Sequence, residues 1–200
     1  MQEGRTVSFL KYDDDHQSET KTLLSVDNIL LQNGTQQAAV RMLVRTWNDE
    51  EIYENFITRC DGSRFYIDMS FYLNEFYLAK NDGMDVSISG DFLEFPANMK
   101  SGDRLKDGAV LVEMSMEGIP AMSLNYKISN RKVIAQERVE TNAGTFDCFK
   151  ITYHFESDMG LMNVHGTAIE WWSEDMIAVK REEYDAKGNL VSTSTVESVR

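Results

Sequence analysis

The feature that most constrains this chain is an alternation of apolar and polar residues with a period of two, which recurs along most of its length. Successive side chains of a β-strand point to opposite faces, so this alternation is typical of strands that are buried on one side. In the clearest run, residues 145–156, the apolar face is formed by Phe149, Ile151, Tyr153 and Phe155. Similar runs occupy residues 36–47, 110–116 and 122–128. The chain is therefore predicted to be mainly β.

Turn signals fall between these runs. Asn33-Gly34 is the strongest kind of hairpin signal, and Asp61-Gly62, Glu117-Gly118 and Lys187-Gly188 mark further turns. A regular succession of strands and turns favours an antiparallel meander, which closes as a barrel, a partial barrel or a sandwich. Since no change of composition and no linker divides the chain, residues 1–200 are predicted to form a single β domain.

One segment departs from the period of two. Between residues 70 and 80, Leu73, Phe76, Tyr77 and Lys80 follow helical spacing. Ser70 is a candidate cap at the start, and Asn81-Asp82-Gly83 would end the helix. We expect one short helix near residues 70–80, lying on the sheet.

The charge of the chain excludes some partners. It has 33 Asp and Glu residues against 20 Lys and Arg, for a net charge of −13. Phosphate binding needs clustered cations, so neither a nucleic acid nor an anionic membrane surface is an expected partner. No apolar run approaches the ~18 residues of a transmembrane segment. The first residues, Met1 to Arg5, lack the pattern of a signal peptide, so either the protein is cytosolic or the sequence begins after a removed signal.

The sequence contains no familiar catalytic or metal-binding pattern. None of the three histidines, His16, His154 and His165, has a His or Cys partner at zinc-ligand spacing. There is no Gly-x-Ser-x-Gly elbow and no glycine-rich phosphate loop. We therefore predict no metal, no cofactor and no catalytic residue, and we expect a protein that is not an enzyme.

Methionine suggests a binding site. The chain has eleven methionines, and Met114, Met116 and Met122 lie in two neighbouring alternating runs. They are predicted to line an adaptable apolar pocket; the alternative is ordinary core packing. Trp171 and Trp172 must point to opposite faces, so one is expected to be buried and the other exposed for a partner.

Several longer runs resemble one known family. They are Cys60-Asp61-Gly62, residues 65–69, 90–96, 130–133 and 143–151, Glu170-Trp171-Trp172, and residues 183–190. Together they look like the TapB-family group, exported proteins of Gram-negative envelopes that carry a domain of unknown function. The resemblance spans most of the chain and brings no catalytic residues.

The resemblance implies a fold, a compartment and a disulfide. The family looks similar in architecture to the open β-barrels of LolA-type lipoprotein carriers, so the fold is predicted to be all-β, mainly antiparallel, a meander forming an open or partial barrel. The location implied is the periplasm or an outer-membrane-anchored lipoprotein, with this sequence as the mature region without its signal peptide. In an oxidising compartment, Cys60 and Cys148 are expected to pair; the alternative is two reduced, buried thiols.

Three functions compete at this point. The first is a non-catalytic envelope domain that binds a partner protein or an apolar, lipid-like ligand. The second is a hydrolase-type enzyme of unrecognised kind, and the third is a cytosolic β-barrel binding protein. The sequence sets neither the ligand nor the oligomeric state.

Overall fold

The structure, a computed structural model, describes residues 2–13, 19–76, 84–160 and 162–200. Within these ranges, thirteen strands form one antiparallel sheet, accompanied by one short 3₁₀ helix. The strands are β1 (Thr6–Asp13), β2 (Glu19–Gln32), β3 (Thr35–Arg45), β4 (Glu51–Cys60), β5 (Arg64–Asp68), β6 (Met84–Gly90), β7 (Phe92–Pro96), β8 (Gly108–Met116), β9 (Ile119–Thr141), β10 (Gly144–Asp158), β11 (Asn163–Ser173), β12 (Ala178–Asp185) and β13 (Leu190–Val199), and the helix is η1 (Met69–Phe76).

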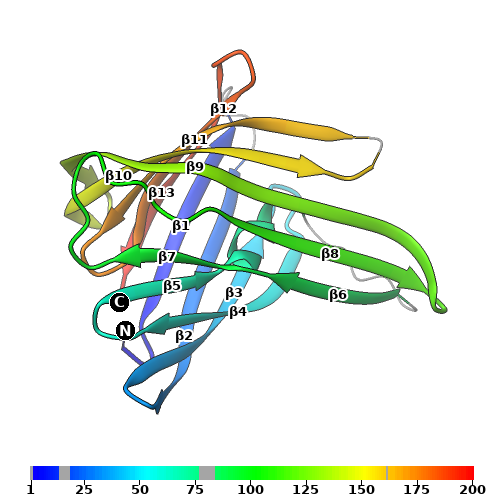
Figure 1. The fold of residues 1–200 in the computed structure, drawn as a ribbon, viewed down its shortest axis with the longest axis horizontal. Coiled ribbons are helices and arrows are strands. Elements are labelled where there is room, and N and C mark those ends of the chain that lie inside the picture. Colours follow the sequence, from blue (N-terminus) through cyan, green and yellow to red (C-terminus); the bar gives the residue numbers. More distant parts are fainter. Residues whose placement is uncertain (1, 14–18, 77–83, 161) are drawn as a thin grey trace.

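The sheet is a meander that curls almost into a barrel, as predicted. Its order is β6-β8-β9-β10-β11-β12-β13-β1-β2-β3-β4-β5-β7, so most neighbours in the sheet are also neighbours in the chain. The exception that closes the curve is the pairing of β13 with β1, which places Val199 opposite Val7. The two ends of the chain consequently lie close together (Figure 1).

The hairpin turns follow from the residues that form them. Asn33 and Gly34 both have positive φ, 52° and 78°, and so do Glu117 and Gly118, at 51° and 78°. Two consecutive residues of this kind give the turn whose twist matches the flanking strands. The turns predicted at these sites therefore join β2 to β3 and β8 to β9.

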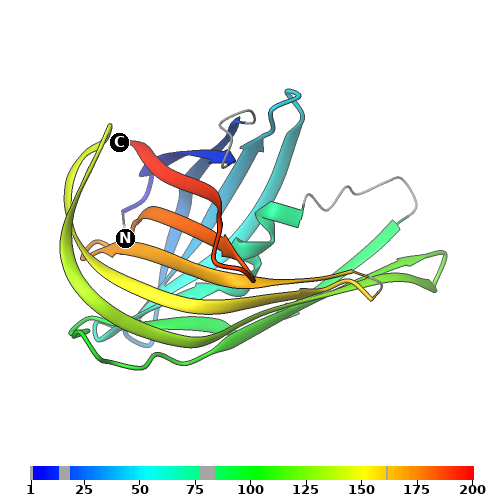
Figure 2. The ribbon, with the colours of Figure 1, turned by 90° about the horizontal axis from the view of Figure 1, so that it is seen from above.

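At the one unsealed seam of the barrel, the chain crosses from one edge strand to the other. The edge strands β6 and β7 are consecutive, joined through Asp91. The Asp91 amide donates to the carbonyl of Ala109 at 2.9 Å, and its carboxylate accepts from the Ala109 amide at 3.0 Å. The segment thus leaves β8 and crosses to β5, and the curled sheet remains unsealed along this line (Figure 2).

Arg131 of β9 bridges the segments beside this seam. Its side chain is buried, with 2% of the residue exposed. Nη1 donates to the carbonyl of Glu94 on β7 at 3.2 Å and to the carbonyl of Lys106 at 2.7 Å. The guanidinium also lies over the ring of Phe95, 4.6 Å from its centre. One planar cation therefore satisfies backbone acceptors of two segments that no sheet ladder joins.

The helix is anchored inside the curled sheet. The carboxylate of Asp68 accepts from the Ser70 amide at 2.9 Å, so Asp68, and not Ser70 as predicted, caps its start. Tyr72 and Leu73 are buried in the main core. The predicted helix is confirmed up to Phe76, and its expected end at residues 77–83 lies outside the described residues.

The main core lies between the walls of the barrel and is rich in aromatic rings. Phe149, Ile151 and Tyr153 belong to it and Phe155 packs against it, which confirms the predicted apolar face of β10. At its centre the rings of Phe95 and Trp172 lie 4.5 Å apart. A second cluster gathers Val7, Cys148, Trp171, Ile177, Val179 and Val196.

The bridging role of Arg131 can be tested by the stability of a variant. Replacing it in Arg131→Met leaves the carbonyls of Glu94 and Lys106 without their donor, and we expect a loss of about 2–4 kcal/mol in the free energy of unfolding. Arg138→Met is the matched control on β9, because Arg138 and its partner Asp147 are both exposed, and it should cost less than about 1 kcal/mol. Urea denaturation measures both, and equal midpoints for the two variants would contradict the bridging role.

Candidate functional site

A cavity runs along the inner face of β1 and β2, and it has two adjoining compartments. The apolar compartment has a volume of about 90 Å³ and is lined mainly by apolar side chains, among them Val7, Leu24, Val26, Val40 and Trp172. The polar compartment has a volume of about 330 Å³, and its lining includes Lys11, Thr20, Thr22, Arg181 and Ser194. Phe9, Phe71 and Ala178 line both, so the two spaces meet at these side chains.

The change of polarity along the cavity lining follows from the register of β1 and β2. Val7 lies opposite Leu24, Phe9 opposite Thr22, and Lys11 opposite Thr20. Each pair shares one face of the sheet, because directly opposed residues of antiparallel strands point the same way. Moving along both strands toward Lys11, the inward residues therefore change together from apolar to polar.

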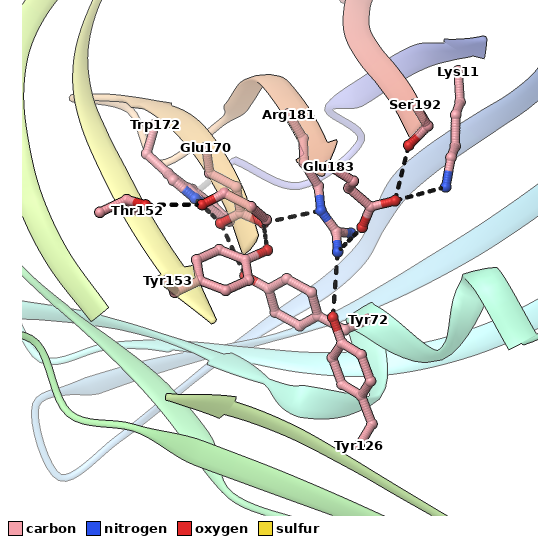
Figure 3. A network of polar contacts seen from close by, with 11 residues as sticks. Lys11, Tyr72, Tyr126, Thr152, Tyr153, Glu170, Trp172, Arg181, Glu183 and Ser192 are labelled. Atoms are coloured by element: carbon pink, nitrogen blue, oxygen red, sulfur yellow. Dashed lines mark hydrogen bonds and ion pairs between the residues drawn. The ribbon is translucent and has the colours of Figure 1, made fainter. Parts of the chain in front are cut away.

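A buried carboxylate stands at the wall of the polar compartment. Glu170 of β11 is 2% exposed. Its oxygens accept from the hydroxyl of Tyr153 at 2.8 Å, the indole N–H of Trp172 at 2.7 Å and the hydroxyl of Tyr72 at 3.2 Å. Figure 3 shows these donors converging from β10, β11 and η1. A charge this far from water persists only where donors replace its hydration, and here three do so.

The ion pairs continue from Glu170 across the sheet. Nε of Arg181 lies 3.6 Å from Glu170, and its Nη2 lies 2.5 Å from Glu183. Glu183 also accepts from the hydroxyl of Ser192 at 2.8 Å and from Lys11 at 3.3 Å. Glu170 faces Arg181 and Glu183 faces Ser192 in the strand register. Charges of alternating sign therefore run from Glu170 on β11 through Arg181 and Glu183, both on β12, to Lys11 on β1, and β13 contributes the uncharged Ser192.

Three groups of this network, Glu183, Tyr72 and Tyr153, have pKa values shifted by their surroundings. Burial opposes ionisation of Glu183, but Arg181 and Lys11 outweigh it and lower its pKa to about 2. Burial raises the pKa values of Tyr72 and Tyr153 well above the ordinary range, so both keep the protons that they donate. Glu183 and the two tyrosines thus hold Arg181, Lys11 and Glu170, which line the polar compartment, from behind its wall.

The structure places the three predicted methionines elsewhere. Met114 is buried in the main core, whereas Met116 and Met122 are 51% and 46% exposed. Met114 faces Met122 across the β8–β9 ribbon, whose far end projects from the barrel (Figure 2). None of the three lines either compartment, so an apolar pocket at these residues stays a prediction.

The predicted disulfide is not supported. Both thiols are free: Cys60 is half-buried and Cys148 is buried. Their strands, β4 and β10, are not neighbours in the sheet, and Cys148 faces Glu137 and Ser173 instead. Burial raises the pKa of the Cys148 thiol to about 12, so Cys148 is a packed, unreactive thiol.

The prediction that one of the paired tryptophans is exposed is wrong, because both are buried. Trp172 belongs to the main core, and Trp171 belongs to the second cluster. The ring of Trp171 is covered by the ammonium groups of Lys150 and Lys180, at 4.7 and 4.9 Å from its centre. Alternation alone cannot show that long cationic side chains cover the outer ring.

The described residues hold no group of three His, Cys, Asp or Glu side chains placed to bind a metal ion. His154 and His165 line a shallow surface groove with Glu156, and His16 lies outside the described residues. No helix in the described ranges is long and apolar enough to cross a membrane.

Comparison with known proteins assigns the family. The chain matches the model of the family described as DUF3108-like over residues 2–196. The chain belongs to the DUF3108-like family. The family name stands for a domain of unknown function. This agrees with the resemblance found in the sequence, which was also to proteins that carry such a domain. The narrower likeness to the TapB group stays a prediction.

Two solved structures share the fold of this DUF3108-like chain. One is a presumed exported protein of Bacteroides fragilis with a YmcC-like fold, 22% identical, with a TM-score of 0.83. The other is a presumed lipoprotein of Parabacteroides distasonis, 20% identical, with a TM-score of 0.84. Each alignment covers 100% of this chain and 96% of the other. A comparison with curated proteins found no match.

The ion pairs of Glu183 predict that its contribution to stability is lost at low pH. Its pKa in the folded protein lies below its ordinary value of 4.5, so its ionisation contributes stability that is present above pH 4.5 and is lost as the pH falls toward 2. The difference in unfolding free energy between the wild type and Glu183→Gln should be largest at neutral pH and shrink between pH 4.5 and 3. The exposed Glu174→Gln is the control, with a difference near zero throughout. Urea titrations at pH 7, 4.5 and 3 measure both, and a pH-independent difference for Glu183→Gln contradicts the pairing.

The free state of Cys60 and Cys148 can be tested by alkylation. Iodoacetamide applied in urea without reductant should add two alkyl groups, as read by intact mass. Under native conditions Cys60 should react before Cys148, because the thiolate is the nucleophile and burial suppresses it at Cys148. If alkyl groups are added only after a reductant is present, the cysteines are paired in a disulfide and the free thiols are refuted.

Proposed function

We propose that this DUF3108-like protein is a non-catalytic protein of the cell envelope whose barrel binds a small amphipathic, lipid-like ligand in the cavity along β1 and β2. The observation that carries this proposal is the cavity lining, which changes from apolar to polar along the same two strands. A ligand with one apolar end and one polar end matches that gradient.

The lining separates the roles of the two compartments. Val26, Val40 and Leu24 offer no hydrogen bonds from their side chains, so the apolar compartment favours an alkyl group. Thr20, Thr22 and Ser194 offer hydroxyl groups that both donate and accept. The charges of Glu170, Arg181 and Lys11 are already paired within the network, which favours an uncharged polar group over a bare ion beside them.

The same pairing supports a binding role over the hydrolase alternative. A general base needs a free lone pair and a pKa near the working pH. The Glu170 carboxylate already accepts from Tyr72, Tyr153 and Trp172. Ion pairs with Arg181 and Lys11 hold the pKa of Glu183 near 2, far from a working base. Both carboxylates thus serve to hold the site together.

The envelope location rests on similarity. The two structural neighbours are described as a presumed exported protein and a presumed lipoprotein, and the resemblance to the TapB group points the same way. A cytosolic binding protein is the alternative. Fractionation of cells of the source organism, with detection of the protein by antibody, separates the two: recovery with the soluble cytosolic fraction would refute the envelope assignment.

Ligand binding is tested by filling the cavity. Ala178 lines both compartments, so Ala178→Leu places three further carbon atoms where they meet. Isothermal titration calorimetry with 1-hexanol should show saturable binding to the wild type and at least ten-fold weaker binding to this variant.

The matched control is Ala143→Leu, the same substitution at a half-buried alanine beside the second cluster. It should bind 1-hexanol as the wild type does. Wild-type affinity in Ala178→Leu would contradict the proposal, as would the absence of saturable binding to the wild type.

A further inference from the structure

Phe71 stands between the two compartments. Its ring is half-buried, and it lines the apolar compartment on one side and the polar compartment on the other. We infer that Phe71 limits the length of the alkyl chain that the cavity accepts. This inference rests on the proposed binding of an amphipathic ligand.

The ring is held in place by its neighbours. Its centre lies 5.3 Å from that of Phe56 on β4, 6.4 Å from that of Trp172 on β11, and 5.1 Å from that of Tyr72 in an edge-on contact. Such contacts between rings at 4.5–7 Å are favourable, so Phe71 is packed from both walls of the barrel. It is therefore a partial partition, which narrows the junction of the two compartments.

The next residue fixes the backbone of the helix at this point. The hydroxyl of Tyr72 donates to Glu170, its ring is stacked on Tyr126 with centres 6.3 Å apart, and the guanidinium of Arg181 lies 5.3 Å from its centre. Figure 3 shows Tyr72 between these groups. Because Tyr72 is tied to the charged network, displacing the backbone at Phe71 would break buried hydrogen bonds.

The volumes of the two compartments indicate the effect of the Phe71 ring. A dry cavity of about 150 Å³ holds a benzene molecule. The apolar compartment, at about 90 Å³, is smaller and takes an alkyl group of a few carbons. A longer chain needs the space beyond Phe71, where the polar compartment offers about 330 Å³. Removing the ring widens the junction between the two spaces.

The test is the chain-length dependence of binding. Calorimetry with n-alcohols from butanol to dodecanol should show, in the wild type, an affinity that rises with length and then stops rising near hexanol. Each further buried methylene is worth about a four-fold gain in affinity. In Phe71→Ala this gain should continue for several more carbons. Phe71→Trp, which enlarges the partition, should stop the rise at a shorter alcohol.

The control is Phe155→Ala, which removes another half-buried ring from the edge of the main core, away from both compartments. It should keep the wild-type limit. Phe71→Leu retains part of the bulk and serves if Phe71→Ala does not fold; its limit should be intermediate.

The outcomes separate the two claims. If the wild type binds alcohols and the Phe71 variants have the same length limit, the role of Phe71 is refuted and the proposed function stands. If Phe155→Ala extends the limit as much as Phe71→Ala does, loosening of the barrel is the cause and the role of Phe71 is again refuted. If no alcohol binds to any variant, the proposed function falls, and the inference falls with it.

Discussion

The structure depends on one buried carboxylate. Glu170 lies within the barrel, and its charge is tolerated because donors on η1, β10 and β11 and a cation on β12 surround it. Those donors are side chains of the same elements that build the core, so satisfying Glu170 also positions η1 inside the curled sheet. The partition at Phe71 and the polar end of the cavity both follow from this arrangement.

The cavity exists because the two walls of the barrel carry side chains of different size. The inward residues of β1 to β3 are mainly short, such as Val7, Thr22 and Val40, whereas the rest of the main core includes the large side chains of Trp172, Tyr153 and Phe95. Protein interiors are otherwise close-packed, so a space of this kind beside an aromatic core is the basis of the ligand site that we propose. The proposed ligand is amphipathic because one end of the cavity is apolar and the other is polar.

Much of the fold could be predicted from the chain, and little of the site. The runs at Phe149–Phe155 and the turns at Asn33-Gly34 mark strands because period two and positive φ are local properties. Period two does not mark β1, because both of its faces carry apolar residues, including Phe9 and Leu10, which blurs the alternation. The pairing of β13 with β1 joins residues about 190 positions apart, and no local pattern encodes it. The cavity is lined by strands from both ends of the chain, so its residues are neighbours only in the folded structure. The methionines near Met116, in contrast, are close together in the sequence, which is why the sequence pointed to them.

The central claim is that an alkyl group enters the apolar compartment with its polar end toward Lys11. A crystal structure with 6-bromohexan-1-ol tests it directly, because the anomalous signal of bromine locates the apolar end. The account predicts bromine among Leu24, Val26 and Val40, with the hydroxyl group toward Thr20 and Thr22. Bromine at Met116 and Met122 on the projecting ribbon, or a barrel interior without bromine at saturating alcohol, would contradict it.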